Sequence, residues 1–306
     1  MDYFILNPKA HSSQSTLLWP AIHQRLHQTA TPYKVCATEY EGHATVLARD
    51  ISENDPDATI VVVGGDGSVH EVINGLTHLD TVKLGVIPHG SGNDFVNGLH
   101  IPTDPEFALN AILSPRKMKR IDLGCLEADG KKSLFGVSCG IGMDASICEE
   151  ALSSPIKDTL NEVHLGQMTY GTIGARQVVT YEPGPMKVRL DGERIFTYKD
   201  MFFLTVMNLK YEGGGLELVP WARPDDGILD IFVCGDGLTR AELVSAIPLA
   251  RKGLHVRYPH IHFVKCKTVE VIADKKRPVH LDGESFGLHS KIRVTLLPRA
   301  LNVITG

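Results

Sequence analysis

Two short stretches of the chain combine glycines, a hydroxyl side chain and a carboxylate in a pattern typical of phosphate binding. The first is TIVVVGGDGSVHEVINGL at 59–76, and the second is LGVIPHGSGNDF at 84–95. In each, an apolar run ends in glycines and continues as a predicted helix, with Asp66 or Asp94 at the turn. Glycine turns bring ligand oxygens close to bare N–H groups, and a helix N-terminus favours an anion. Both stretches therefore predict phosphate contacts.

The carboxylate in the first turn indicates that a metal ion accompanies the phosphate. Asp66 would repel a phosphate unless a cation lay between them, so it predicts a magnesium-bridged nucleotide. The spacing of Ser68 and Glu71 also predicts a capping box at the start of the following helix. One such turn is equally well explained by a capped helix with a solvated aspartate. A second turn of the same design within thirty residues favours one shared site. Neither stretch is a P-loop or a G-x-G-x-x-G fingerprint.

A third motif, Asp282-Gly283-Glu284, supplies two further carboxylates. Phosphoryl transfer to an alcohol needs an in-line acceptor, a metal ion and a group that takes the hydroxyl proton, and either carboxylate could be that base. The alternative is an ordinary hairpin turn, in which Asp-Gly is common. The same dipeptide occurs at Asp129, Asp191, Asp226 and Asp236, so the motif alone does not select a function.

The segments that must position these motifs alternate between strand and helix over the first ~120 residues. Strands are expected at 3–6, 33–38, 59–63 and 84–87, and helices at 17–28, 43–51 and after each glycine turn. This order predicts a Rossmann-like α/β domain of three layers. Ligands of such sheets lie at the carboxyl ends of the strands, where both glycine turns occur.

The composition changes near Arg120–Gly124, after which strand-like runs separated by Gly, Pro and Asp dominate. Strands are expected at 134–140, 186–190, 202–209, 228–233, 268–272 and 292–297, with helices at 158–164, 170–179 and 240–249. This pattern predicts a C-terminal β-sandwich. We therefore expect a nucleotide-binding α/β domain at 1–122 and a β-sandwich substrate domain at 123–295.

Composition and charge exclude several classes of protein. A formal net charge of −5 argues against a nucleic-acid partner. The six cysteines form no C-x-x-C pair, which predicts reduced thiols in a cytoplasmic protein. We expect no signal peptide, because the first residues form only a short apolar run, and no transmembrane segment, because no stretch approaches the ~20 apolar residues required. Eight Lys or Arg between Arg251 and Arg277 could meet anionic lipid head groups or form a solvated face.

The three motifs together resemble the diacylglycerol kinase catalytic family, in particular the bacterial lipid kinases of the NAD kinase-like superfamily. The resemblance rests on GGDGSVHEVINGL, PHGSGNDFVNGL and HLDGES, in this order along nearly the whole chain. GGDG alone also occurs in NAD kinases and phosphofructokinases, whereas its combination with GSGNDF and a late DGE is typical of lipid kinases. Ser68 and Ser91 stand where threonine is usual, and both keep a hydroxyl.

The resemblance implies an ATP- and Mg²⁺-dependent kinase that transfers the γ-phosphoryl group to a hydroxyl of diacylglycerol or a related lipid. The acceptor would be met at the inner membrane face, and the strand at about 296–306 would return to the first domain. The residues implied to bind the nucleotide are Thr38, Gly64, Gly65, Asp66, Gly67, Ser68, Val69, His70, Gly90, Ser91, Gly92, Asn93 and Asp94.

The resemblance also implies roles in metal binding and catalysis. Magnesium would be held with Asp66, Asp94 and Asp122. A structural magnesium ion would be bound by the side chain of Asp226 and the backbone carbonyls of Arg223 and Ile228. Glu284 would be the base, assisted by Asp282, with Asp66 part of the catalytic centre.

Two other functions are compatible with the motifs. A kinase for a soluble acceptor such as NAD would share the first turn, and a non-catalytic nucleotide- or lipid-binding regulator could retain the fold. The acceptor lipid, the preferred nucleotide and the formation of a homodimer are not fixed by the sequence.

Overall fold

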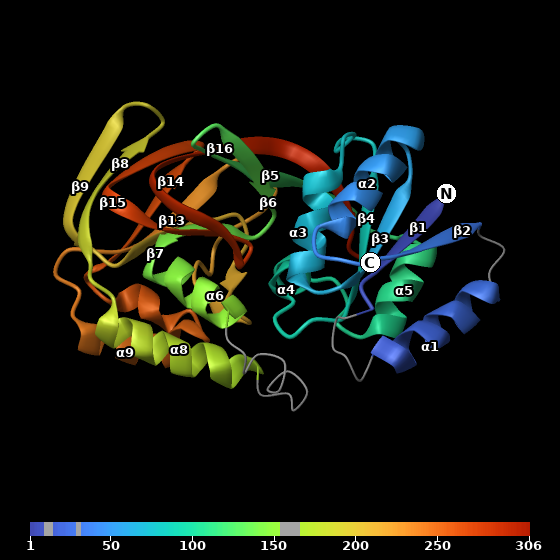
Figure 1. Cartoon of the computed structure of the whole chain (residues 1–306), viewed down its shortest axis with the longest axis horizontal. Helices are drawn as coiled ribbons and strands as arrows, with labels where there is room; N and C mark the ends of the chain where they lie inside the picture. Colours follow the sequence, from blue (N-terminus) through green and yellow to red (C-terminus); the bar gives the residue numbers. More distant parts are fainter. Residues whose placement is uncertain (9–14, 29–31, 154–165) are drawn as a thin grey trace.

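A parallel sheet forms the first of two lobes in the computed structural model, which describes residues 1–8, 15–28, 32–153 and 166–306. Its strands follow the order β4-β3-β1-β2 and are β1 (Asp2–Leu6), β2 (Tyr33–Ala37), β3 (Thr59–Gly64) and β4 (Lys83–Pro88). The helices of this lobe are α1 (Ser15–His27), α2 (His43–Asn54), α3 (Asp66–Gly75), α4 (Asp94–Leu99) and α5 (Pro105–Leu113). They lie on opposite sides of the sheet (Figure 1).

Alternation of side chains along β3 explains the layers. Ile60 and Val62 belong to the apolar core formed with α2 and α3, whereas Val61 and Val63 belong to the core formed with α1 and α5. Successive residues of a strand point to opposite faces, so a continuous apolar run is suited to a sheet covered on both sides. The three-layer, Rossmann-like α/β lobe expected from the sequence is confirmed.

The second lobe consists mainly of antiparallel strands. They are β5 (Met118–Ala128), β6 (Lys131–Phe135), β7 (Ser138–Gly142), β8 (Gly184–Leu190), β9 (Arg194–Met201), β10 (Phe203–Met207), β13 (Leu229–Cys234), β14 (Ile261–Cys266), β15 (Thr268–Leu281) and β16 (Glu284–Ile304), with a small hairpin of β11 (Tyr211–Glu212) and β12 (Leu216–Glu217). The helices α6 (Met143–Ser153), α8 (Gly166–Thr180) and α9 (Arg240–Ala250), with the short 3₁₀ helix η1 (Leu254–Arg257), accompany them. Figure 1 shows α6, α8 and α9 gathered below these strands. The expected β-sandwich lobe is confirmed.

One long strand joins the two lobes. β16 pairs with β15 and β5 in the second lobe, and its end pairs in parallel with β4 through Asn302 and Val303. Within the described residues, every strand outside the β11–β12 hairpin therefore belongs to one continuous sheet of 14 strands. The expected boundary between 122 and 123 falls inside β5, which pairs with β16 on both sides of it.

Two local predictions are wrong. Ser68 and Glu71 form no capping box, because α3 begins earlier, at Asp66, with Gly65 as its N-cap and without a side-chain cap. The carboxylate of Glu71 instead accepts a hydrogen bond from the amide of Ala44, in the first turn of α2. The expected strand at 134–140 is divided into β6 and β7.

The other expectations about helices, cysteines and membrane spans have the following outcomes. The helices expected at 170–179 and 240–249 are present as α8 and α9, whereas the one expected at 158–164 lies outside the described residues. All six cysteines are free thiols. No helix in the described part of the chain is long and apolar enough to cross a membrane.

Candidate active site

The two glycine turns meet because β3 and β4 are neighbours in the parallel sheet. Their last residues, Gly64 and Pro88, are paired, and the amide of His89 donates to the carbonyl of Gly64 at 2.9 Å. Directly beyond, the backbones of Gly65 and Gly90 are so close that a Cβ on Gly90 would lie 2.6 Å from the Cα of Gly65. Glycine is needed at this point because any side chain would separate the two turns.

The first turn leads directly into α3, so the free amides of the helix N-terminus face the turn. The hydroxyl of Ser68 accepts a hydrogen bond from the side chain of Asn7, which follows β1. The side chain of Val69 is buried in the core, so only its backbone could contact a nucleotide. Gly65, Asp66 and Gly67 line a cavity.

The second turn is closed by its own asparagine. The side chain of Asn93 accepts from the amide of Gly90 and donates to the carbonyl of the same residue. Asn93 has a φ of 54°, in the left-handed region that asparagine tolerates better than most residues. Gly90, Ser91 and Gly92 are thereby presented to the same cavity as the first turn.

The carboxylates of Asp66, which is partly buried, and Asp94, which is buried, lie between the two turns. Asp66 accepts hydrogen bonds from the amides of Asp94 and Phe95, the first residues of α4, and Asp94 accepts from those of Gly214 and Gly215. Burial raises the pKa of Asp66 above its ordinary value although the amide hydrogen bonds oppose this. Burial and then the charge of Asp66 raise the pKa of Asp94 to about 7.

These two carboxylates fit a divalent cation. A Cβ on Gly92 would lie 3.0 Å from Oδ2 of Asp66 and 3.8 Å from Oδ2 of Asp94, so both oxygens border the same space. Mutual repulsion of this kind is relieved by a cation, and oxygen ligands suit Mg²⁺.

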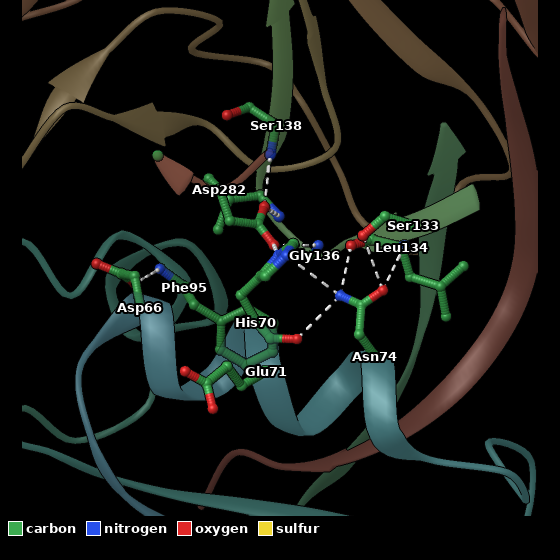
Figure 2. A network of polar contacts seen from close by, with 12 residues as sticks. Asp66, His70, Glu71, Asn74, Phe95, Ser133, Leu134, Gly136, Ser138 and Asp282 are labelled. Carbon is green, nitrogen blue, oxygen red and sulfur yellow. Dashed lines mark hydrogen bonds and ion pairs between the residues drawn. The ribbon is translucent and has the colours of Figure 1, made fainter. Parts of the chain in front are cut away.

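Asp282 contacts the first lobe from the turn between β15 and β16. Figure 2 shows its carboxylate beside His70, whose Nδ1 lies 3.0 Å from Oδ2. The same carboxylate accepts hydrogen bonds from the amides of Gly136, Val137 and Ser138. These amides turn toward Asp282 at the break between β6 and β7, which explains why the expected single strand is divided. His70 therefore contacts the second lobe through its side chain.

Asn74 lies one turn of α3 beyond His70 and also joins the lobes. Its side chain donates to the carbonyl of Leu134 at 2.9 Å, and it accepts from the amide of Leu134 and the hydroxyl of Ser133 (Figure 2). No sequence motif singled out Asn74, although its i, i+4 spacing from His70 places both on one helical face.

Glu284 points at the first glycine turn. A Cβ on Gly67 would lie only 2.5 Å from Oε1 of Glu284, so the glycine leaves room for this carboxylate. Glu284 and Asp282 line the same cavity of about 220 Å³ as both glycine turns. The structure thus brings the three sequence motifs together at one cavity between the lobes.

Thr38 and Asp122 lie in other surroundings. Thr38 follows β2, at the edge of the sheet, where its amide donates to the carbonyl of Leu6. Asp122 is fully buried in β5, and its carboxylate accepts from the amides of Gly227 and Arg299. Both of its oxygens are thus engaged with other segments of the second lobe and of β16. A role for Asp122 beside Asp66 and Asp94 stays a prediction.

The loop proposed to hold a structural magnesium ion is folded on itself. The side chain of Asp226 accepts from the amide of Ile228 at 3.1 Å, and the guanidinium of Arg223 pairs with Asp225. The exposed Asp226 shows that the loop is accessible to solvent, and its metal binding stays a prediction.

A second cavity, of about 190 Å³ and mainly apolar, adjoins the first. Its walls come from α6, α8, α9 and the strands beneath them, and it shares Cys148, Glu212 and Gly213 with the polar cavity. A polar cavity continuous with an apolar one can accommodate an amphiphile. Glu212 carries no sequence signal beyond its position before three glycines.

The basic run at 251–277 is not a uniform cationic surface. Arg277 is 2% exposed, and its guanidinium donates to Tyr181, Glu182 and Asp274. This residue therefore stabilises the second lobe and is not available to lipid head groups.

Comparison with known proteins agrees with this arrangement of motifs. Residues 3–126 match the model of the diacylglycerol kinase catalytic domain, and residues 138–305 match that of the YegS C-terminal NAD kinase beta sandwich-like domain. The chain belongs to the diacylglycerol kinase catalytic family. It is therefore a member of a lipid kinase family.

Individual relatives cover most of the chain. It is 28% identical to a protein named "Diacylglycerol kinase" from Staphylococcus carnosus, over 92% of this chain and 88% of the relative. It is 30% identical to "Probable lipid kinase YegS-like" from Chromohalobacter salexigens, over 90% of this chain and 85% of the relative. A crystal structure of a diacylglycerol kinase from Bacillus anthracis superposes with a TM-score of 0.73 at 24% identity, covering 100% of this chain and 96% of that one, which shows the shared fold.

Proposed function

We propose that this protein is an ATP- and Mg²⁺-dependent kinase that transfers the γ-phosphoryl group to a hydroxyl of diacylglycerol or a related lipid. The observation that carries the proposal is the meeting of three motifs at one polar cavity, which shares lining residues with an apolar one. The acceptor would be met at a membrane surface, with its acyl chain in the apolar cavity and its hydroxyl directed toward Glu284.

The roles of the residues follow from their surroundings. The amides of the two glycine turns and of the α3 N-terminus would bind the triphosphate. Asp66 and Asp94 would hold Mg²⁺, which neutralises the charge on the phosphate oxygens when it is bound. Glu284 faces Gly67 across the cavity and would take the proton of the acceptor hydroxyl.

Asp282 suits a positioning role better than that of the base. Its side chain is 4% exposed, and its carboxylate is already bound by His70 and the backbone amides of 136–138. Both of its oxygens are therefore occupied by protein donors and are not directed at an acceptor hydroxyl in the cavity. This geometry favours Glu284 as the base.

The test is a phosphorylation assay with labelled ATP and Mg²⁺. The purified protein is incubated with diacylglycerol, ceramide and sphingoid bases in one arm and with NAD in the other, and the products are separated by thin-layer chromatography. We expect a phosphorylated lipid and no NADP, and we expect Asp66→Ala to abolish the product. Unimpaired turnover of Asp66→Ala would rule out the assignment of the metal site. Nucleotide binding without product would indicate a non-catalytic regulator.

A further inference from the structure

Three ionisable side chains from distant parts of the chain meet where the polar and apolar cavities join. They are Asp144 of α6, Glu212 of β11 and His280 of β15. Nε2 of His280 lies 3.3 Å from Oδ2 of Asp144 and 3.3 Å from Oε1 of Glu212. We call these three residues the junction cluster. None of the three lies in the glycine-turn motifs, and none of them is the proposed base.

One atom of the junction cluster has no hydrogen-bond partner within the described part of the chain. Glu212 is 9% exposed, and its Oε2 is buried without a donor from any described residue. Asp144 is better satisfied, because the hydroxyl of Thr205 donates to its Oδ2 at 2.6 Å. A buried carboxylate oxygen without a donor costs free energy, so a ligand that brings a donor would be stabilised here.

The charge of the junction cluster points to the same kind of ligand. With both carboxylates ionised, the cluster carries a net charge of −2 when His280 is neutral and −1 when it is protonated. It therefore attracts a cation or a hydrogen-bond donor in either state and repels the carbonyl oxygens of an ester. A metal ion fits less well. The amide of Gly283 donates to Nδ1 of His280, whereas a metal on Nε2 would require a proton on that same Nδ1.

The position of Glu212 decides which part of a ligand it would meet. Glu212 lines both cavities, and Asp144 lines the apolar one. A lipid with its chain in the apolar cavity and its reacting hydroxyl near Glu284 must pass its head group beside Glu212.

We propose that the junction cluster recognises a second hydrogen-bond donor, an amino or hydroxyl group, on the head of the acceptor lipid. This inference rests on the proposed function and narrows its substrate class. Diacylglycerol has one free hydroxyl, which the transfer reaction uses, and its remaining head-group oxygens are ester acceptors. The cluster thus selects lipids such as monoacylglycerols or sphingoid bases over diacylglycerol.

The experiment compares kcat/KM for three acceptors in mixed micelles. 1,2-Dioleoylglycerol has one hydroxyl, 1-monooleoylglycerol has two, and sphingosine adds an amino group. Each is assayed with the native protein, with Glu212→Gln, and with Glu217→Gln as the matched control. Glu217 lies on the same hairpin and lines neither cavity, so it reproduces the change of charge without the contact. Melting temperatures establish that all variants are folded.

We expect the native protein to prefer the acceptors with a second donor. Glu212→Gln should reduce that preference about tenfold, as the loss of one hydrogen bond to a charged group would, while Glu217→Gln should leave it unchanged. A larger loss for sphingosine than for monooleoylglycerol would identify the amino group as the preferred donor. A native preference for dioleoylglycerol, or a preference that Glu212→Gln leaves within twofold of native, would overturn the inference while the kinase function stands.

A binding measurement separates this inference from the proposed function. If none of the lipids is phosphorylated, the proposed function fails, and the recognition is then measured without nucleotide as displacement of a fluorescent sphingosine. Monooleoylglycerol should compete better than dioleoylglycerol for the native protein but not for Glu212→Gln. Equal competition in both proteins would refute the recognition role.

Discussion

Replacing each acid of the DGE turn by its amide should affect a different property of the protein. Asp282→Asn should mainly reduce stability, whereas Glu284→Gln should mainly reduce turnover. The reason is their different surroundings. Asp282 receives four donors, at 2.7 to 3.1 Å, whereas Glu284 borders the cavity opposite Gly67.

The magnitude for Asp282→Asn follows from its hydrogen bonds. Each of its two oxygens accepts two of the four contacts, so an amide retains one oxygen and turns an NH₂ group toward the donors of the other. Hydrogen bonds to a charged group contribute about 1.5–3 kcal/mol each, and two of them are lost. We therefore expect the free energy of unfolding to fall by about 3–6 kcal/mol. Glu284→Gln should change it by less than about 1 kcal/mol and lower kcat by about 10²- to 10⁴-fold.

Asp129 provides a matched control for Asp282. It too precedes a glycine, has a positive φ, and pairs with a histidine, His289, at 2.7 Å. Its side chain is 67% exposed, so Asp129→Asn should cost less than about 1 kcal/mol. Urea unfolding followed by circular dichroism measures stability, and release of ADP in the presence of lipid measures turnover. If Asp282→Asn unfolds at the native midpoint and loses as much turnover as Glu284→Gln, Asp282 acts in the chemistry and its positioning role is refuted.

Three further predictions concern the glycine turns and the charges around them. Gly90→Ala should weaken binding of a fluorescent ATP analogue at least tenfold, because the new Cβ would lie 2.6 Å from the Cα of Gly65. The control is Gly306→Ala, whose Cβ would lie 3.9 Å from its nearest neighbour, and it should bind the analogue normally. In EDTA, the free energy of unfolding should fall by on the order of 2–4 kcal/mol as the pH rises from about 4 to 7. The reason is that folded Asp94 keeps its proton to about pH 7, whereas the unfolded chain loses it near 3.8. A pH dependence of Asp94→Asn as steep as that of the native protein would contradict this. Burial lowers the pKa of His70, but the hydrogen bond and charge of Asp282 raise it above 6.5. The stabilisation from this pair is therefore complete below pH 6.5 and is lost as the pH rises through the folded-state pKa of His70. The difference in unfolding free energy between the native protein and His70→Gln should accordingly shrink from pH 6 to pH 9, and a constant difference would show that the histidine is not charged.

Local patterns gave much of the fold because they depend on neighbouring residues. The valine- and isoleucine-rich run at 59–63 reads as a strand covered on both faces, and its alternate side chains do enter two different cores. The prediction of a capping box was wrong because it also used only nearby residues. Ser68 and Glu71 have the correct spacing, but the sequence does not specify that the helix starts at Asp66 and that Glu71 meets Ala44.

The sequence by itself determined the position of the two glycine turns, because strand ends and glycines are local features and neighbouring parallel strands bring their carboxyl ends together. Only the tertiary structure distinguished Asp282 from Glu284 and assembled the junction cluster. His70 and Asp282 are 212 residues apart, and His280 and Asp144 are 136 apart. Which of the two carboxylates of this turn is enclosed by donors, and which faces a cavity, depends on how β6, β7 and β15 pack against α3. The spacing of residues along the chain does not predict that packing.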